Sequence, residues 1–245
     1  DRGVQEGWIA FARTFVATAA TLAAANSDWL TFGIEPINEP FAGSASPLFV
    51  SNPVQSLFGF TYYLSTAQTG QIATRLFPFY QKFIRGIQDL PGFGNLAAHA
   101  LFVLDPFLLD HMNVKASFAG QAIALDSDGD YSRFADLQKA PGTDTALYWI
   151  AGPHHYDGAL DPGFQSFLPA VIGNMIANYP NYLYHPAQLS ARMKRQQDRF
   201  LAAGMDLFYG EWGTYTKLGN YKGWLADSIS AMKTYSRGFA WWRYE

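Results

Sequence analysis

The stretch GIEPINEP, residues 33–40, places Glu35 and Glu39 at the end of an apolar run that closes on Pro40. Proline restricts the residue before it and cannot donate to a strand ladder, so the run predicts a buried strand that ends here. Side chains alternate along a strand, which puts both glutamates on one face, with Glu39 at the rim and Glu35 two layers lower. A carboxylate is costly to bury without a partner, so we expect other polar groups nearby.

Four further apolar runs end in polar or special residues, and they span residues 100–107, 146–156, 205–212 and 238–245. Helical patterns precede these runs at 75–90, about 164–178, 186–203 and 221–236. One more helix is predicted over residues 5–25, where apolar side chains recur three and four residues apart. Strands that alternate with helices predict a parallel sheet covered by helices, because parallel neighbours need crossover connections.

Polar residues at the carboxyl ends of successive parallel strands are typical of the (β/α)8 TIM barrel. We therefore predict an α/β fold of this class, with residues 1–245 forming a single partial catalytic barrel domain. Two insertions interrupt it, at about 41–74 and 108–145. Five strands leave open edges and an uncovered core, so we expect upstream residues, or another chain, to supply the three that are lacking.

Composition excludes several classes of function. The formal net charge is -3, and only 15% of residues are charged, so there is no basic field to bind nucleic acid. The absence of cysteine excludes disulfides, thiolate metal sites and a cysteine nucleophile. Apolar stretches are broken by Gly, Pro or charge before the roughly 18 residues of a membrane span, so no transmembrane segment is expected. Aromatic residues, at 17%, serve either sugar stacking or a large core.

A second glutamate, Glu211, ends the apolar run of DLFYGEWGT, residues 206–214. Two carboxylates at the same end of one barrel suit glycoside hydrolysis, in which one protonates the leaving oxygen and the other attacks the anomeric carbon or activates water. Glu39 taken alone fits an exposed strand-end acid or a helix N-cap equally well. The pair favours catalysis.

The motifs INEP (37–40) and GEWG (210–213) resemble the acid/base and nucleophile strands of glycoside hydrolase family 5, a family of retaining β-glycosidases with α/β barrels. The segments LFPFYQKFIRGI, LFVLDPF and PHHYDG are similar to the endoglycoceramidase-like branch. The resemblance covers about residues 5–245 and implies a hydrolase that needs no cofactor. Because His99, His111 and His185 lack partners at the spacing of a metal site, no catalytic metal is expected. We expect a secreted or periplasmic location.

Roles follow residue by residue from this resemblance. It implies that Glu39 is the acid/base and Glu211 the nucleophile. It further implies substrate-binding roles: a sugar 2-hydroxyl contact for Asn38, a His-x-Tyr pair that steers the nucleophile for His154 and Tyr156, and the subsite floor for Trp242. Only one of Trp241 and Trp242 should face inward. Retention requires the two carboxylates about 5–5.5 Å apart, whereas inversion needs about 6.5–9.5 Å.

Other polar residues have simpler interpretations. His155 and Glu35 are expected to support the site, and Asp105 to be a rim or capping residue. DSDGD, residues 126–130, resembles a calcium loop, but its glycine comes at the fourth position rather than the sixth, so a solvated acidic turn stays the alternative.

The insertion directly after Glu39 points to the aglycone. Residues 41–65 are rich in large apolar side chains, such as Phe49, Phe58 and Phe60, in a segment punctuated by Gly, Ser and Pro, next to the acid that protonates the leaving oxygen. This favours a glycolipid or another β-glycoside with an apolar aglycone. The alternatives are an endo-β-glucanase, a purely structural cap at 41–65, or a noncatalytic protein that binds sugar or glycolipid.

Overall fold

The structure is a computed structural model that describes residues 2–26, 32–38, 40, 72–106, 115–118, 121–124, 130–156, 186–213 and 221–241. Its helical elements are α1 (Arg2–Ala25), the π-helical turn η3 (Ile72–Leu76), α3 (Phe77–Ile87), α4 (Phe93–His99), the 3-10 helix η4 (Ser132–Leu137), α9 (Pro186–Ala202) and α10 (Tyr221–Tyr235). Its strands are β1 (Phe32–Ile34), β2 (Ala100–Leu104), β3 (Lys115–Phe118), β4 (Gln121–Ala124), β5 (Tyr148–Ala151), β6 (His155–Tyr156), β7 (Asp206–Gly213) and β8 (Gly238–Trp241).

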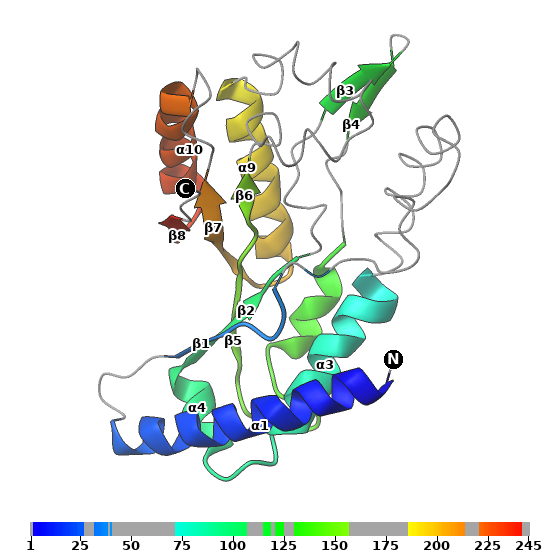
Figure 1. Ribbon diagram of the computed structural model, residues 1–245, viewed down its shortest axis with the longest axis vertical. Coiled ribbons are helices and arrows are strands. Elements are labelled where there is room, and N and C mark those ends of the chain that lie inside the picture. The colour runs from blue at the N-terminus through cyan, green and yellow to red at the C-terminus, as the bar shows by residue number, and fades with distance from the viewer. Residues whose placement is uncertain are drawn as a thin grey trace.

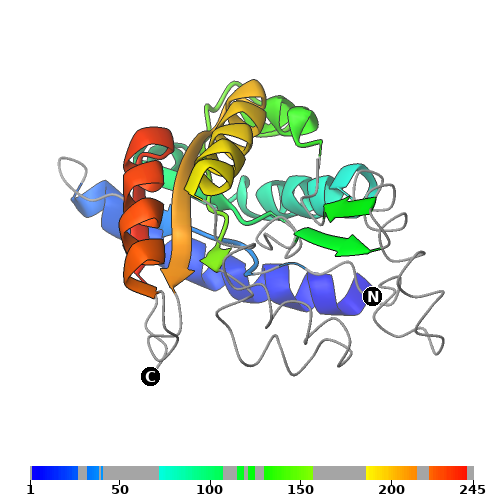
Figure 2. The same ribbon diagram turned by 90° about the horizontal axis from the view of Figure 1, so that it is seen from above.

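The main sheet is parallel and follows chain order through β1, β2, β5, β7 and β8. β5 and β6 both pair with β7, so they are two parts of one strand. Figures 1 and 2 show α1, α3 and α4 around the β1 and β2 half of the sheet, and α9 and α10 beside β7. The sheet is that of a partial (β/α)8 barrel with five consecutive strands, which confirms the predicted fold class.

The predicted elements are found where the structure describes the chain. All five predicted strands are present, and the helices expected at 5–25, 75–90, 186–203 and 221–236 correspond to α1, α3, α9 and α10. The first strand is shorter than predicted: β1 ends at Ile34, so Glu35 follows the strand, and the expectation that it lies on a strand face two layers below the rim is wrong. The helix expected at about 164–178 lies outside the described residues. The sequence did not predict α4, η4 or the β3–β4 hairpin, which pairs Lys115 with Ala124 inside the second insertion.

Neither end of the described sheet is closed. Among the strands that the structure describes, β1 pairs only with β2, and β8 only with β7. Two unpaired end strands are consistent with the expectation that three further strands complete the barrel. Where those strands come from stays a prediction.

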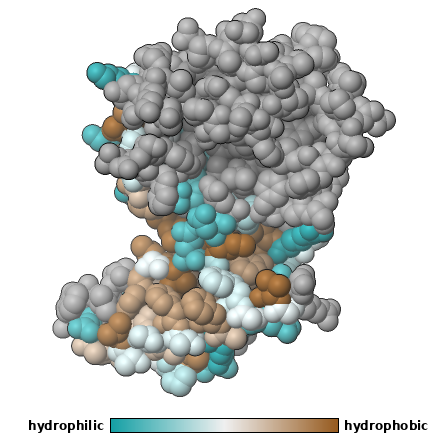
Figure 3. All heavy atoms as spheres, in the orientation of Figure 1, coloured by the Kyte–Doolittle hydropathy of each residue, from teal (hydrophilic) through white to brown (hydrophobic). Residues whose placement is uncertain are grey.

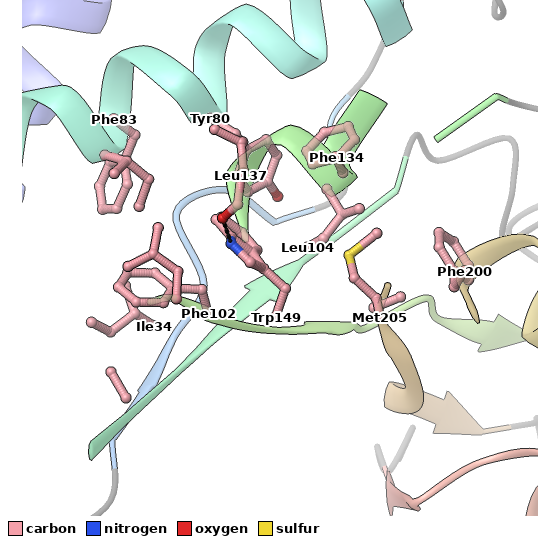
Figure 4. Packing of buried hydrophobic residues seen from close by; sticks show 14 of the residues in the cluster. Ile34, Tyr80, Phe83, Phe102, Leu104, Phe134, Leu137, Trp149, Phe200 and Met205 are labelled. Carbon is pink, nitrogen blue, oxygen red and sulfur yellow. Dashed lines mark hydrogen bonds between the residues drawn. The ribbon is translucent and has the colours of Figure 1, made fainter. Parts of the chain in front are cut away.

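The hydrophobic core draws on all the long helices, and Figure 4 shows the part of it between the sheet and the helices α3 and η4. Tyr80 of α3 meets Trp149 of β5 and Phe134 of η4 edge-on, at centroid distances of 5.7 and 5.5 Å. The Trp149 indole donates a hydrogen bond of 2.6 Å to the carbonyl of Leu137. Each of these rings is at most 5% exposed, and the indole N–H has the partner that burial demands.

The β5 part of the sheet makes an unusually close contact with its neighbours at Gly152. The Gly152 N–H donates to the Leu104 carbonyl at 2.8 Å, which continues the β2–β5 ladder by one residue. A Cβ at Gly152 would lie 2.5 Å from a methyl of Val103, and one at Gly210 would lie 3.2 Å from the Gly152 carbonyl oxygen. Glycine at both positions lets β2, β5 and β7 approach closely just where the polar strand ends begin.

Helix α1 buries its small side chains rather than its large ones. Its buried face consists of Ile9, Ala12, Val16, Ala19, Ala20 and Ala23. α1 packs tightly on α3, because a Cβ at Gly86 would lie 2.4 Å from the Ile9 side chain. Arg13 secures the contact by donating to the Gly86 carbonyl and to Asp89, and this hydrogen bond lowers the pKa of the Asp89 carboxyl.

A second face of α1, roughly 100° around the helix from the buried one, is an exposed apolar stripe, which we call the outer stripe. It is formed by Val4, Trp8, Phe11, Phe15 and Leu22, which are 41–69% exposed. Figure 3 shows apolar surface across the lower part of the molecule, where α1 runs. By length and composition alone, Gly3–Ala25 could cross a membrane, whereas the sequence analysis expected no such segment. A third of the most apolar window of this helix is buried in the fold.

Candidate active site

Four ionisable side chains occupy the carboxyl ends of neighbouring strands, and we call them the strand-end row. Glu35 follows β1, Asp105 follows β2, His154 lies between β5 and β6, and Glu211 belongs to β7. One nitrogen of the His154 ring, Nδ1, lies 3.6 Å from Glu211 Oε2, and the other, Nε2, lies 4.0 Å from Asp105 Oδ2. Both distances are within ion-pair range and longer than a hydrogen bond.

Burial differs along this row. The Asp105 and His154 side chains are 0% and 1% exposed, whereas that of Glu211 is 25% exposed. Glu35, which follows the end strand β1 of the described sheet, is exposed as well. The centre of the strand-end row is therefore buried, whereas the carboxylate of Glu211 is accessible to a ligand.

Asp105 is held by α3 through its backbone. The Asp105 N–H donates to the Tyr80 hydroxyl at 3.0 Å, and that hydroxyl lies 3.4 Å from the Asp105 carbonyl oxygen, to which it donates. Burial, and then the negative charge of Asp105, raise the pKa of Tyr80 well above its usual value, so the phenol stays neutral. The expectation that Asp105 is a rim residue is therefore wrong: it ends its strand, but α3 covers it.

An irregularity in β7 turns Glu211 toward His154. The pairing of β7 with β8 shifts register between Tyr209 and Trp212. Tyr209 donates to Gln196 of α9 at 2.8 Å, and the Trp212 ring lies 5.9 Å from that of Trp224 in α10, so both side chains point to the helix layer. Strict alternation would send Glu211 the same way as Tyr209, and the bulge instead gives it the opposite face.

The structure places only some of the predicted site residues. It joins His154 to Glu211, and it leaves Asn38 exposed, four residues beyond β1. Glu39 and Trp242 lie outside the described residues, as do Asp126–Gly129 of the candidate calcium loop and most of the insertion at 41–74. Only the backbone of Tyr156 is described, paired with Gly213. The distance between the two glutamates thus stays a prediction.

The neighbouring tryptophan, Trp241, lies at the end of β8. It is 44% exposed, and its ring meets that of Trp212 edge-on at 4.6 Å. Because Trp212 points to the helix layer, this contact places Trp241 on the helix side of the sheet. Trp242, which the resemblance implies is the inward tryptophan, lies outside the described residues, so its orientation stays a prediction.

A second buried polar cluster, centred on His155, joins β6 to the helices behind it. The His155 ring stacks on Trp224 at 5.2 Å, its Nε2 lies 3.3 Å from the Ser228 hydroxyl, and its Nδ1 lies 3.2 Å from Arg192 Nη1. A guanidinium can only donate, so Nδ1 accepts and Nε2 carries the proton. Burial, and then the charge of Arg192, lower the pKa of His155 well below its usual value.

This cluster predicts a pH dependence of folding. The pKa of His155 is depressed in the fold, so below the unfolded value of about 6.5 the unfolded chain takes up a proton that the native chain does not. The stability that comes from His155 is complete above that pH and is lost as pH falls toward the depressed value. Urea unfolding between pH 7 and pH 5 should show a loss of stability that His155→Gln reduces. His99→Gln, at the end of α4, is the control, and an equal slope in both variants would contradict the prediction.

One group among the described side chains could hold a metal ion. Glu35, Asp105 and His154 each offer a ligand atom, and these atoms lie within 4.8 Å of one another. Two carboxylates and an imidazole suit Zn²⁺ or Mn²⁺ in ligand type. The expectation that the chemistry needs no metal therefore stays a prediction to be tested against this trio.

Comparison with known proteins gives matches only among solved structures. No family model matches the chain, and no curated protein matches it. Endo-glycoceramidase II from Rhodococcus sp. matches at a TM-score of 0.47 and 14% identity, over 97% of this chain and 39% of that one. An endogalactoceramidase matches at 0.43 and 18%, over 99% and 38%. A GH5-4 broad-specificity endoglucanase from Bacteroides salanitronis matches at 0.46 and 13%, over 98% and 55%.

By their names, one of these proteins is an endo-glycoceramidase, one is an endogalactoceramidase and one is an endoglucanase, and all three are glycoside hydrolases. The chain spans between 38% and 55% of their length.

Proposed function

We propose that this chain carries the catalytic half of a retaining β-glycoside hydrolase that acts by double displacement. The observation that supports the proposal is the orientation of Glu211. A bulge turns this partly exposed carboxylate out of the alternation of β7 and places it beside the buried His154. It sits at the edge of the sheet where β1 also ends, shortly before Glu39.

In the proposed first step, Glu211 attacks the anomeric carbon while Glu39 donates its proton to the glycosidic oxygen. The C–O bond to the aglycone breaks, the aglycone leaves as an alcohol, and a glycosyl ester forms on Glu211. Glu39, now a carboxylate, then removes a proton from a water molecule that attacks the same carbon. This second step frees the sugar with its original configuration and returns both glutamates to their starting states.

The remaining predicted residues bind the sugar. Asn38 would donate to the sugar 2-hydroxyl, a contact that strengthens in the transition state. Tyr156 would steer the nucleophile, and Trp242 would form the floor of the subsite. His154 already lies beside Glu211 in the absence of a sugar, which supports its assignment to this site.

The proposed substrate is a glycolipid or another β-glycoside with an apolar aglycone. The apolar insertion at 41–65 comes directly after Glu39, and the group that Glu39 protonates is the one that carries the aglycone. A polysaccharide substrate of the endo-β-glucanase kind is the second candidate, because the motifs INEP and GEWG resemble glycoside hydrolase family 5 as a whole. A noncatalytic protein would bind sugar or glycolipid without turnover.

The aglycone proposal predicts a dependence on chain length. With alkyl β-glycosides of increasing length, kcat/KM should rise about fourfold per added methylene over the first few, since each buried methylene contributes about 0.8 kcal/mol. Cello-oligosaccharides are the matched comparison. A flat profile together with good cleavage of cello-oligosaccharides would assign the protein to the glucanase class. Binding of glycosides without any release of product would identify a noncatalytic protein.

A further inference from the structure

We propose that the outer edge of β1 and the outer stripe of α1 form one docking surface. Its occupant is a strand of the same protein, supplied by residues before Asp1, that pairs parallel with β1 and leads into α1. This docking surface is independent of the proposed reaction, and it defines where the expected barrel strands join the described fold and which side chains they cover.

The outer stripe lies beside the carboxyl end of β1. The Trp8 indole donates a hydrogen bond of 2.9 Å to the carbonyl of Pro36, two residues after β1 ends. The Trp8 ring stacks with that of Phe11 at 5.5 Å, so the rings of the stripe continue from this point along α1. The buried face of α1 is already occupied, because it packs against α3 and α4. The stripe is thus continuous with the interface that joins α1 to the rest of the fold.

The handedness of the crossovers decides on which side of β1 the added strand lies. A connection between parallel strands of one sheet is right-handed in about 98% of cases. The chain passes from β1 through α3 and α4 to β2, and α1 packs against both of these helices, so the three helices form one layer. With the helices in that layer, successive strands advance from β1 toward β8. A parallel strand that leads into α1 with the same hand therefore lies on the side of β1 away from β2.

A second apolar surface borders the same edge, on the inner face of the sheet, which points away from the helices. Leu101 of β2 and Tyr148 of β5 pair in register and are 41% and 57% exposed, whereas the residues that follow them in each strand are buried on the helix side. Gly33 of β1 pairs with Leu101, and apart from its chain neighbours a Cβ at Gly33 would meet no atom within 4 Å. These three residues, which we call the inner row, therefore border open space.

Together these features fit a strand better than another occupant. A strand alternates its side chains between the two faces of a sheet, so one set can pack on the outer stripe while the other extends the inner row. Its backbone also satisfies the edge of β1, which pairs only with β2 among the described strands. A lipid surface or a second copy laid against α1 would bury the stripe and leave the inner row in water. Because both of its faces are buried, the added strand should be a nearly continuous apolar run.

Cysteines introduced at this surface test the proposal, because the chain has none of its own. Phe15→Cys probes the outer stripe, and Leu101→Cys probes the inner row. Leu201→Cys on α9 is the matched control, since Leu201 is 50% exposed and Phe15 is 57% exposed. Each variant is prepared in the 245-residue chain and in the full-length gene product. The rate of alkylation by iodoacetamide is then measured by mass spectrometry of the peptide that carries the cysteine.

In the 245-residue chain, all three thiols should react readily. In the full-length gene product, Phe15→Cys and Leu101→Cys should each react at least about tenfold more slowly than in the shorter chain, since a covered thiol reacts only when the local structure opens. Leu201→Cys should react at the same rate in both proteins, because the added strand lies at the other end of the sheet.

Hydrogen exchange gives a second readout that needs no substitution, so it holds even where a cysteine impairs folding. In the 245-residue chain, only those amides of β1 that pair with β2 should be protected. The full-length gene product should protect further amides of β1, because the added strand pairs with its outer edge. The amides of β2 are the control, since β2 already pairs with β1 and β5, and they should exchange alike in both proteins.

Several results would overturn the proposal. Equal labelling of Phe15→Cys in the two proteins would show that no upstream strand covers the outer stripe. Protection of both probes already in the 245-residue chain would assign the surface to another segment of that chain, and protection that grows with protein concentration would assign it to a second copy. Protection of Phe15→Cys without Leu101→Cys, in the full-length product or on phosphatidylcholine vesicles, would show an occupant that touches α1 alone.

Discussion

Replacing Glu211 by glutamine is expected to lower kcat by about 10⁴-fold or more on every β-glycoside that the protein cleaves. The amide keeps the shape of the carboxylate but cannot form the glycosyl ester, and removal of a nucleophile leaves only the catalysis that binding and the remaining polar groups provide. Initial rates on an activated aryl β-glycoside and on an alkyl β-glycoside measure the effect. The loss should be similar for both, because both require the same bond to carbon.

Glu6→Gln is the control for this experiment. Glu6 lies on α1, in an exposed ion pair with Lys82, and its loss should leave the rates unchanged. In the unaltered protein, proton NMR of the first product should show the β anomer, because two displacements restore configuration. An α product, or a Glu211→Gln variant that keeps a tenth of the activity, would contradict the assignment of Glu211 as nucleophile.

Replacing Glu39 by glutamine is expected to separate substrates by their leaving groups. For alkyl glycosides, whose alcohol leaves only with a proton, kcat/KM should fall by about 10²–10⁴-fold, the usual contribution of a general acid. For an activated aryl glycoside, whose phenolate leaves unaided, kcat/KM should stay near that of the unaltered protein. Steady-state rates on the two substrate series provide the measurement.

The same variant should be slow in the second step, because no base remains to take the proton of water. Azide, which attacks without giving up a proton, should therefore raise kcat on the activated substrate and yield a glycosyl azide. Glu35→Gln, in the same segment, is the matched control and should show neither the leaving-group dependence nor the azide effect. An equal loss for Glu39→Gln on both substrate series would undo the assignment.

The strands could be predicted because their signals are local. Each buried run ends at a residue with an unmistakable backbone or polar character, such as Pro40 or Pro106, and the runs alternate with helical patterns. The order of the parallel sheet then follows, since neighbours in sequence become neighbours in the barrel. The β3–β4 hairpin was missed because Ala and Ser dominate it, and these residues give little strand signal.

The details of the site depend on contacts between distant segments. The face that Glu211 occupies is set by a bulge, and alternation along β7 would have given the other one. Asp105 is buried, and its backbone is hydrogen-bonded to Tyr80, 25 residues earlier in the chain. Likewise, two faces of α1 are apolar in sequence, and the buried one is the face of small side chains that lies close to α3 at Gly86.

The outer stripe of α1 has a consequence for how the chain behaves in solution. Attraction between apolar surfaces weakens on cooling and strengthens in sulfate, which is excluded from protein surfaces. One side of α1 exposes the aromatic rings of Trp8, Phe11 and Phe15 to water. Two molecules that meet through this side should therefore associate more strongly at higher temperature or in sulfate. We therefore expect self-association through this side to be weaker in chilled buffers with little sulfate and stronger when sulfate is added.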